Sequence, residues 1–344
     1  MNIDPALLTE TPEQTELRAV VRDLLAGDED DKLWARLAGE VGVHGLAIPE
    51  QYGGSGYTFA ELAVVLEETG WTLSCASLLP TVVLAANTLV HSGNEQACER
   101  YLPSIADGTL TATVAGFDGV PTVHAEHGVG GWVLHGTVDF VLDGQYAGLV
   151  LVRAGDRIFT VDRWRSTPRR VLDETRPQAL LEFSGTPATP LCGAEITGTV
   201  LDIGRAALAA EQVGGVAHIL ADTVSYVRQR HQFDRPIGSF QAVKHRLADL
   251  LVELEAARSA AAYATACVVT AAEDLRIAAS AAATVCSAAF QRAAAEYVQL
   301  HGGIGFTWEH PAHRYVRRAR AGEVLFGDQQ FHRARLAALI SNPS

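Results

Sequence analysis

The stretch YVRQRHQFDRPIGSFQAVKHRLADL, residues 226–250, decides the fold because it lies between long helical segments. Residues 202–230, which overlap the start of this stretch, run nearly thirty positions without proline. After it, residues 241–273 and 274–303 keep the same alanine-rich texture. Three long helices with small residues on their faces suit close antiparallel packing in a bundle. Their small apolar outer faces also indicate burial in an oligomer.

Upstream of this region, residues 111–195 have a different texture. The segments 130–144, 146–161 and 178–185 alternate in polarity, are rich in Val and Thr, and are punctuated by Gly and Asp. Such segments are typical of strands and hairpins. We therefore expect one β domain inserted between helical regions.

The first ~110 residues are again helical in pattern. Residues 10–27 have helix-type apolar spacing, with Thr11-Pro12 as a cap and first turn. The sequence therefore predicts an α+β fold in three domains. The expected ranges are an N-terminal helical domain (1–110), a middle β domain (111–195) and a C-terminal helical bundle (196–344).

Composition excludes several classes of protein. Hydrophobic residues make up 48% and charged residues 19%, and the net charge is −13, so wholesale binding to nucleic acid or to an anionic membrane is not expected. The five cysteines form no CxxC pair, so the sequence indicates neither a zinc site nor a disulfide framework. The N-terminal segment lacks the apolar core of a signal peptide. The sequence has no run of about 18 apolar residues free of charge, so we expect no membrane span. We expect a cytoplasmic protein with reduced thiols. The histidines show no metal-ligand spacing, so we expect no metal site.

Three motifs carry a family resemblance. The segments AIPEQYGGSG (47–56), 226–250 and QLHGGIGFTWEHPAHRYVRRAR (299–320) resemble the acyl-CoA dehydrogenase family, in the same order and spacing. The resemblance implies an N-terminal α domain, a middle β domain and a C-terminal four-helix bundle. It also implies FAD-dependent α,β-desaturation of an acyl-CoA, with an electron-transfer flavoprotein as acceptor.

That reaction makes definite physical demands. The α proton of a thioester is too weakly acidic for water to remove at a useful rate. The enzyme must polarise the thioester oxygen and place a carboxylate near the α carbon. A flavin must lie against the acyl chain, because the protein has no hydride acceptor of its own.

The resemblance divides the cofactor site between two subunits. In the family, a neighbour's C-terminal bundle supplies an Arg and a Phe from an RxxFG motif, a Gln, and a Gln and Gly-Gly that contact pyrophosphate and adenosine. This half is kept here: the matching residues are Arg230, Phe233, Gln241, Gln299, Gly302 and Gly303. One departure is Asp234, which stands where the motif has glycine.

The other half, which grips the flavin ring from the β domain, is eroded. Only Ala115-Gly116-Phe117-Asp118 remains of a TEPxAGSD-like segment. In the next hairpin, Gly136 and Thr137 are kept, Val138 replaces a lysine, and Phe140 takes a tryptophan's place. Phe140 either packs on a flavin edge or faces the core of the domain.

The family's catalytic glutamate is absent from both of its known places. Counting from the RRAR element puts Phe326 at the glutamate and Gly327 at the glycine that follows it. Asp328 then falls at a threonine and Gln330 at a glutamine. Other members carry the glutamate just before an arginine that matches Arg205, but Gly204 stands there. Substitute bases are Asp328, Asp202 and Glu323, and each is displaced from the usual position. A misplacement of about 1 Å can already cost ~10²-fold in rate.

The asymmetry predicts a subunit that completes the flavin site of a homologous partner in a hetero-oligomeric acyl-CoA dehydrogenase. The family includes α2β2 enzymes of actinobacteria that desaturate sterol side-chain CoA thioesters, which makes steroid-CoA the preferred substrate class. Two alternatives remain open. One is a homomeric dehydrogenase that uses Asp328 or Asp202 as base. The other is a non-catalytic scaffold or binding protein of the same fold.

Overall fold

The computed structural model describes residues 3–27, 32–74 and 77–341. The chain divides into two compact units, each treated by itself below. The first comprises Met1–Ala26, Ala63–Ser74 and Arg205–Ser344, and the second comprises Gly27–Leu62 and Cys75–Gly204. Segments far apart in sequence therefore share each unit.

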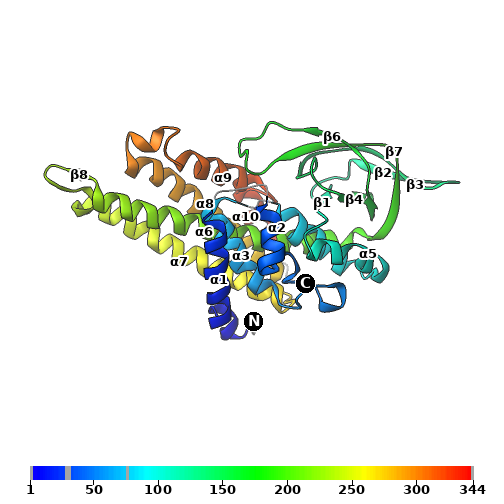
Figure 1. Cartoon of the computed structure of the whole chain (residues 1–344). Coiled ribbons are helices and arrows are strands. Elements are labelled where there is room, and N and C mark those ends of the chain that lie inside the picture. Colours follow the sequence, from blue (N-terminus) through cyan, green and yellow to red (C-terminus); the bar gives the residue numbers. More distant parts are fainter. Residues whose placement is uncertain (1–2, 28–31, 75–76, 342–344) are drawn as a thin grey trace. The chain divides into compact units, whose positions relative to one another are not determined.

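Short helices dominate the N-terminal part of the chain (Figure 1). They are α1 (Pro12–Leu25), α2 (Leu33–Arg36), α3 (Phe59–Thr72), α4 (Ala86–His91) and α5 (Glu95–Ala106). The start of α1 confirms the predicted cap. The Thr11 side chain accepts from the Gln14 amide, and the Gln14 side chain accepts from the Thr11 amide. The segment 43–58 forms only short 3₁₀ turns at Val43–Gly45 and Glu50–Tyr52, as its glycines and proline predict.

A seven-stranded sheet follows, with the order β1-β4-β5-β7-β3-β2 and with β6 paired to β7. The strands are β1 (Ala112–Ala115), β2 (Val123–Gly128), β3 (Gly131–Leu142), β4 (Leu149–Ala154), β5 (Arg157–Val161), β6 (Arg165–Pro168) and β7 (Gln178–Gly193). Only the β1–β4 pair is parallel. The long strand β7 pairs with β3 along its first part and with β5 near its end, and so joins the two halves of the sheet.

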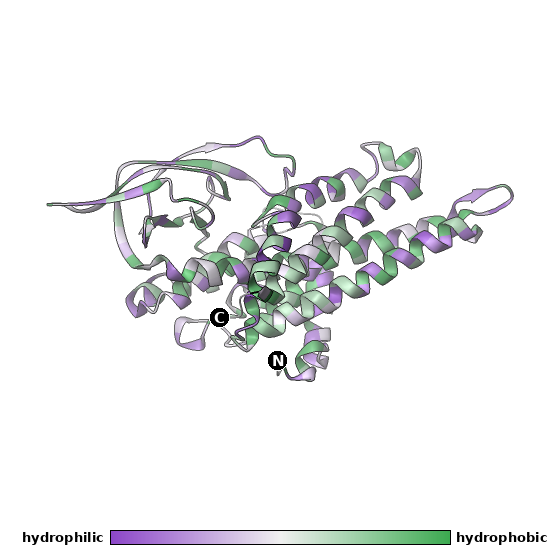
Figure 2. Cartoon of the chain, turned by 180° about the vertical axis from the view of Figure 1, so that it is seen from behind, coloured by the Kyte–Doolittle hydropathy of each residue, from purple (hydrophilic) through white to green (hydrophobic). Residues whose placement is uncertain are grey.

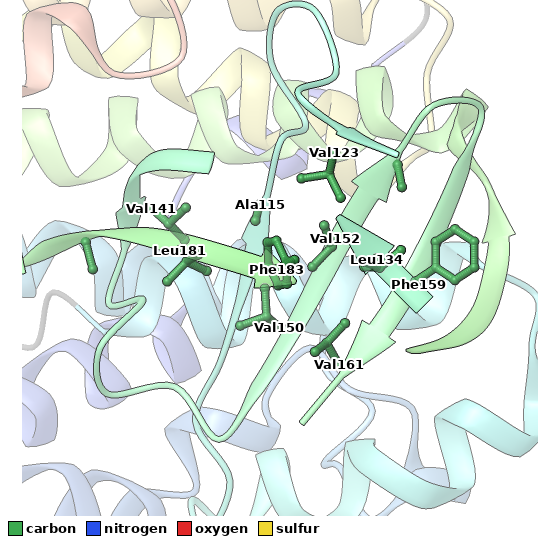
Figure 3. Packing of buried hydrophobic residues seen from close by; sticks show 12 residues of the cluster. Ala115, Val123, Leu134, Val141, Val150, Val152, Phe159, Val161, Leu181 and Phe183 are labelled. Atoms are coloured by element: carbon green, nitrogen blue, oxygen red, sulfur yellow. The ribbon is translucent and has the colours of Figure 1, made fainter. Parts of the chain in front are cut away.

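The core of the sheet is made of alternate strand residues. The side chains of Val150, Val152 and Phe183 pack in it, together with Leu134 and Leu181 (Figure 3). All five are nearly or fully buried. The first part of β7 alternates between buried and partly exposed residues, whereas β4 and β5 are buried on both faces.

Five helices make up the C-terminal region: α6 (Thr197–Gln229), α7 (Gln241–Val269), α8 (Leu275–His301), α9 (Ala312–Val324) and α10 (Gln329–Ser341). A two-stranded hairpin, β8 (His231–Gln232) with β9 (Arg235–Pro236), connects α6 to α7 and projects beyond their ends (Figure 1). The Tyr226 hydroxyl donates to the His301 carbonyl over 3.3 Å. This contact places the C-terminal ends of α6 and α8 together. That is expected when α7 runs antiparallel to both of them.

Helix α3 crosses α6 at glycines on both sides. A Cβ on Gly70 would lie 1.8 Å from the Glu211 carbonyl oxygen, and a Cβ on Gly214 would lie 1.8 Å from the Glu67 carbonyl oxygen. No side chain fits in either gap. The two backbones therefore touch directly, which is the close approach that small residues allow.

The long helices carry apolar residues on more than one side. Polar and apolar residues are interleaved along them (Figure 2), and Leu251 and Val252 of α7 are exposed. Burial of these faces in an oligomer stays a prediction.

The fold class predicted from the sequence is confirmed, since helices precede and follow one β sheet. The three-domain division at residues 110 and 195 remains a prediction, because the two compact units interleave along the sequence. Cys98, Cys192, Cys267 and Cys286 are free thiols, and Cys75 lies outside the described residues. Within the described ranges, no helix is long and apolar enough to cross a membrane.

Candidate active site and cofactor interface

The predicted site residues of the helical region fall at two ends of one helix. Arg205 lies near the start of α6, and Arg230 directly follows its end. At 1.5 Å per residue these positions are about 38 Å apart. The residues expected to complete a neighbour's flavin site are therefore far from those expected at this chain's own reaction centre.

The residue at the position predicted for the base has well-defined surroundings. Phe326 lies between α9 and α10, is 8% exposed, and has a positive φ of 63°. Arg205 donates to its carbonyl oxygen from Nε at 3.1 Å and from Nη2 at 3.0 Å. The Arg205 guanidinium also lies 5.6 Å from the centre of the Phe331 ring. Phe326 is thus tied to α6 by a buried arginine.

Gly327 fixes the same loop from the other side. Its φ is +112°, and a Cβ at this position would lie 2.3 Å from the Phe331 ring. Only glycine fits both the backbone and the space. The loop keeps the glycine predicted from the family pattern and lacks the carboxylate before it.

The three substitute carboxylates have other surroundings. Asp328 is exposed, and its Oδ1 accepts from the Phe331 amide at 2.7 Å, so it caps the N-terminus of α10. Asp202 is buried within α6. Glu323, near the end of α9, forms an ion pair with Arg320 at 3.2 Å. Asp328 in particular already has a structural role that explains its presence.

A small cavity lies beside Arg205 and is lined in part by Gln212, Ser287 and Glu323. Its volume is ≈ 10 Å³, which is about the room that one water needs. Among the residues that the structure describes, the buried Ser287 hydroxyl has no hydrogen-bond partner, as expected for a group that binds such a water. The cavity cannot hold an acyl chain.

A buried ion pair joins α9 to α6 close to this loop. Arg318 Nη1 donates to Glu211 Oε1 at 2.7 Å, and both side chains are almost fully buried. A buried arginine requires such a partner. Sequence analysis did not find this pair, because the two residues lie far apart in the chain.

The opposite end of the bundle gathers the predicted cofactor residues from three elements. Arg230, Gln241, Gln299, Gly302 and Gly303 are all exposed. Phe233, at the tip of the β8–β9 hairpin, is 86% exposed. A large aromatic ring so exposed is typical of an interaction surface.

This end fits the phosphates of a dinucleotide such as FAD. Nothing lies within 4 Å of a Cβ built on Gly302 or Gly303, so their backbone is open to a ligand. The α7 N-terminus, whose N-cap Phe240 makes no side-chain cap, presents amides that favour an anion. The Arg230 guanidinium adds a positive charge and can donate two parallel hydrogen bonds to a phosphate. Asp234, beside Phe233 and also exposed, opposes this charge.

The β-domain residues are partly as expected. Gly136 has φ +129°, and a Cβ there would lie 2.3 Å from the Thr122 carbonyl, which explains the glycine. Phe140, however, is 60% exposed with φ 55°, at a break in the β3–β7 register. The alternative that Phe140 faces the core is therefore wrong.

Comparisons with known proteins agree with this architecture. Residues 11–109 match the family description "Acyl-CoA dehydrogenase, N-terminal domain", and residues 192–340 match "Acyl-CoA dehydrogenase, C-terminal domain". The chain belongs to the acyl-CoA dehydrogenase family.

Two relatives from Mycobacterium tuberculosis illustrate the similarity. Acyl-CoA dehydrogenase IpdE2 is 37% identical over 311 residues, covering 89% of this chain and 86% of the relative. Acyl-CoA dehydrogenase FadE27 is 33% identical over 344 residues, covering 92% and 89%.

Two solved structures show the same fold. A chain of the Tcur3481-Tcur3483 steroid ACAD G363A variant has a TM-score of 0.87 and 31% identity, covering 97% of this chain and 99% of that one. A chain of the ChsE4-ChsE5 complex from Mycobacterium tuberculosis has a TM-score of 0.88 and 28% identity, with the same coverage.

Proposed function

We propose that this chain is a subunit of an FAD-dependent acyl-CoA dehydrogenase that completes the flavin site of a homologous partner and supplies no base of its own. The observation that carries the proposal is Phe326, which occupies the position of the base and is held there by Arg205. A phenyl ring cannot accept the α proton. The partner subunit supplies the carboxylate and the grip on the flavin ring.

The chain's own residues bind and orient the partner's cofactor. Arg230 and the open backbone at Gly302 and Gly303 hold its phosphates, with Gln241 and Gln299 beside them. Phe233 packs against the cofactor or its partner subunit. Gln330, exposed on the first turn of α10, lies beside the Phe326 loop and not at the Arg230 end, so it would contact a cofactor only from that side. Bound FAD supplies the acceptor for the β hydride, which the protein cannot provide.

The substrate class we propose is a steroid-CoA thioester, in particular a sterol side chain. The support is that one similar solved structure is named a steroid ACAD, at 31% identity. A second similar structure is a complex of two differently named chains, ChsE4 and ChsE5. An electron-transfer flavoprotein is the acceptor that we expect, and the cytoplasm the compartment.

The two alternatives make different predictions. A homomeric dehydrogenase needs Asp328 or Asp202 as base, but Asp328 caps α10 and Asp202 is buried in α6. A scaffold needs no flavin at all. The exposed Arg230, the open glycine backbone and Phe233 favour a cofactor interface over a scaffold.

The experiment is a dye-linked oxidation assay on the purified chain, alone and co-expressed with homologous acyl-CoA dehydrogenase subunits from the same genome. We expect the chain alone to be inactive and a complex to oxidise a sterol side-chain CoA thioester faster than butyryl-CoA or palmitoyl-CoA. Activity of the chain alone would support the homomeric alternative. A complex that oxidises only the fatty acyl-CoAs would contradict the substrate class and leave the subunit role standing.

A further inference from the structure

Three side chains from different elements meet near the C-terminal end of α6. Asp222 lies on α6, His301 is the last residue of α8, and His310 lies between η8 (Ile304–Phe306) and α9. His301 Nε2 lies 3.6 Å from Asp222 Oδ2, and His310 Nε2 lies 4.0 Å from the same oxygen. One ligand atom from each residue lies within 4.8 Å of the other two. These distances are too long for hydrogen bonds.

The His301 ring is oriented as a metal ligand usually is. Its Nδ1 lies 2.8 Å from the Tyr297 carbonyl oxygen, which accepts a hydrogen and so fixes the proton on Nδ1. Nε2 then carries a lone pair on the side of Asp222. A backbone carbonyl that binds the second ring nitrogen is the usual support of a metal-ligating histidine. Burial lowers the pKa of this ring and of His310.

The carboxylate is supported in the same way. The Tyr297 hydroxyl donates to Asp222 Oδ2 over 2.6 Å, and ligating carboxylates are commonly held by such a bond. One tyrosine residue therefore orients two of the three groups, through its carbonyl and through its hydroxyl. The Asp222 side chain is 43% exposed, which leaves solvent access and room to adjust.

We propose that Asp222, His301 and His310 bind a divalent transition-metal ion of the Zn²⁺ type. Two imidazoles and a carboxylate suit Zn²⁺ and its neighbours, and water completes the coordination. A tetrahedral ion with ligands at about 2.0–2.1 Å requires ligand atoms about 3.3 Å apart. The Asp222–His301 and Asp222–His310 distances of 3.6 and 4.0 Å must therefore shorten by less than 1 Å. The two histidine ligand atoms, which lie within 4.8 Å of each other, must approach by up to about 1.5 Å. Binding therefore requires rotation of the Asp222 and His310 side chains.

Of the three proposed ligands, His310 needs the largest change of hydrogen bonding to bind an ion. Its Nδ1 accepts from the Ala312 amide at 3.2 Å, so in the neutral ring the proton lies on Nε2. Binding through Nε2 moves that proton to Nδ1 and breaks this long bond. Substitution of His310 should therefore weaken metal binding less than substitution of Asp222 or His301.

The ion would join the end of α6 to both ends of the segment between α8 and α9. That segment carries Gly302 and Gly303. Sequence spacing gave no hint of the site, because Asp222 is far from the histidines along the chain and His301 and His310 are nine positions apart. The inference does not depend on the proposed function, since it concerns ion binding alone.

The test is calorimetric titration of Zn²⁺ into the EDTA-treated full-length chain, alone or in its complex. We expect one Zn²⁺ per chain with a dissociation constant in the micromolar range or tighter. Asp222→Asn, which keeps an acceptor for Tyr297, and His301→Gln should each weaken binding by at least about 10-fold. The matched control is His124→Gln, because His124 is an exposed histidine of β2 that belongs to no proposed site and stacks on His135. The control should leave binding unchanged.

Two results would overturn the proposal. One is no uptake of Zn²⁺ by the wild-type chain. The other is equal uptake by wild type and by folded Asp222→Asn, which would mark the binding as adventitious. Anomalous scattering from crystals of the wild-type chain soaked in Zn²⁺ is a test that needs no variant. A peak within about 2.1 Å of the three ligand atoms supports the site, and a peak only elsewhere contradicts it.

Discussion

Arg205 holds the backbone carbonyl of Phe326 with two guanidinium nitrogens, although the two residues are 121 positions apart. The contact fixes a loop whose central residue can do no proton chemistry. A buried arginine is costly unless its hydrogen bonds are satisfied, and this carbonyl satisfies two of them. Under the proposed function, the loop has a structural role and supplies no base.

Arg205→Met should destabilise the chain by at least about 2 kcal/mol, because hydrogen bonds to charged groups are worth roughly 1.5–3 kcal/mol each. Urea unfolding followed by circular dichroism measures this. Arg228→Met, a change on the exposed surface of the same helix, is the control and should stay within about 0.5 kcal/mol of wild type. Equal stability of the two variants would show that the Arg205 contact has no structural value.

Asp328 can be tested as a cap and as a base with two substitutions. Asn caps a helix about as well as Asp but cannot act as a base. If Asp328 is only the cap of α10, Asp328→Asn should keep the activity of the complex within about twofold and Asp328→Ala should lose about 1 kcal/mol of stability. A loss of 10²-fold or more in the Asn variant would identify Asp328 as the base.

Gly214→Ala should destabilise the first unit, because the new Cβ would lie 1.8 Å from the Glu67 carbonyl oxygen of α3. Moving two packed helices apart costs typically 1–3 kcal/mol. Gly198→Ala in the same helix meets nothing within 4 Å and should be neutral or slightly stabilising. Thermal unfolding of both variants gives the comparison, and equal melting temperatures would contradict the close crossing.

His44 should make stability depend on pH. Burial against Trp34 lowers the pKa of His44 to about 4. Since the unfolded chain binds this proton at about pH 6.5, the folded state loses stability as the pH falls from about 6.5 to about 4. The loss amounts to about 3 kcal/mol. His44→Leu should be less sensitive than wild type between pH 7 and 5 in urea unfolding, and identical pH profiles would exclude this cause.

The sequence predicted the larger features of the fold well, because they rest on local patterns. The long helices around residues 226–250 and the alternating strands appear where periodicity placed them. The α1 cap at Thr11 was equally local. Contacts such as that between Gly70 and Glu211 were not predictable, because the need for glycine at a helix crossing depends on the backbone of the neighbouring helix.

The site was predictable only through motif order. The residues predicted to bind the cofactor, among them Arg230, Gln299 and Gly302, lie at one end of the bundle, as their order along antiparallel helices implies. Phe140 was ambiguous because a register break, and not strand alternation, sets its exposure. The Asp222–His301–His310 cluster was missed because helix packing alone brings it together.

The central claim is that this subunit completes the flavin site of a homologous partner. The number of bound FAD molecules per chain tests it most directly. The account predicts no FAD on the purified chain alone and one FAD per pair of chains after co-expression with its homologous partner. It also predicts that Arg230→Ala in the complex loses FAD, whereas Arg228→Ala keeps it. Stoichiometric FAD on the chain alone, or unchanged FAD in the Arg230→Ala complex, would contradict the account.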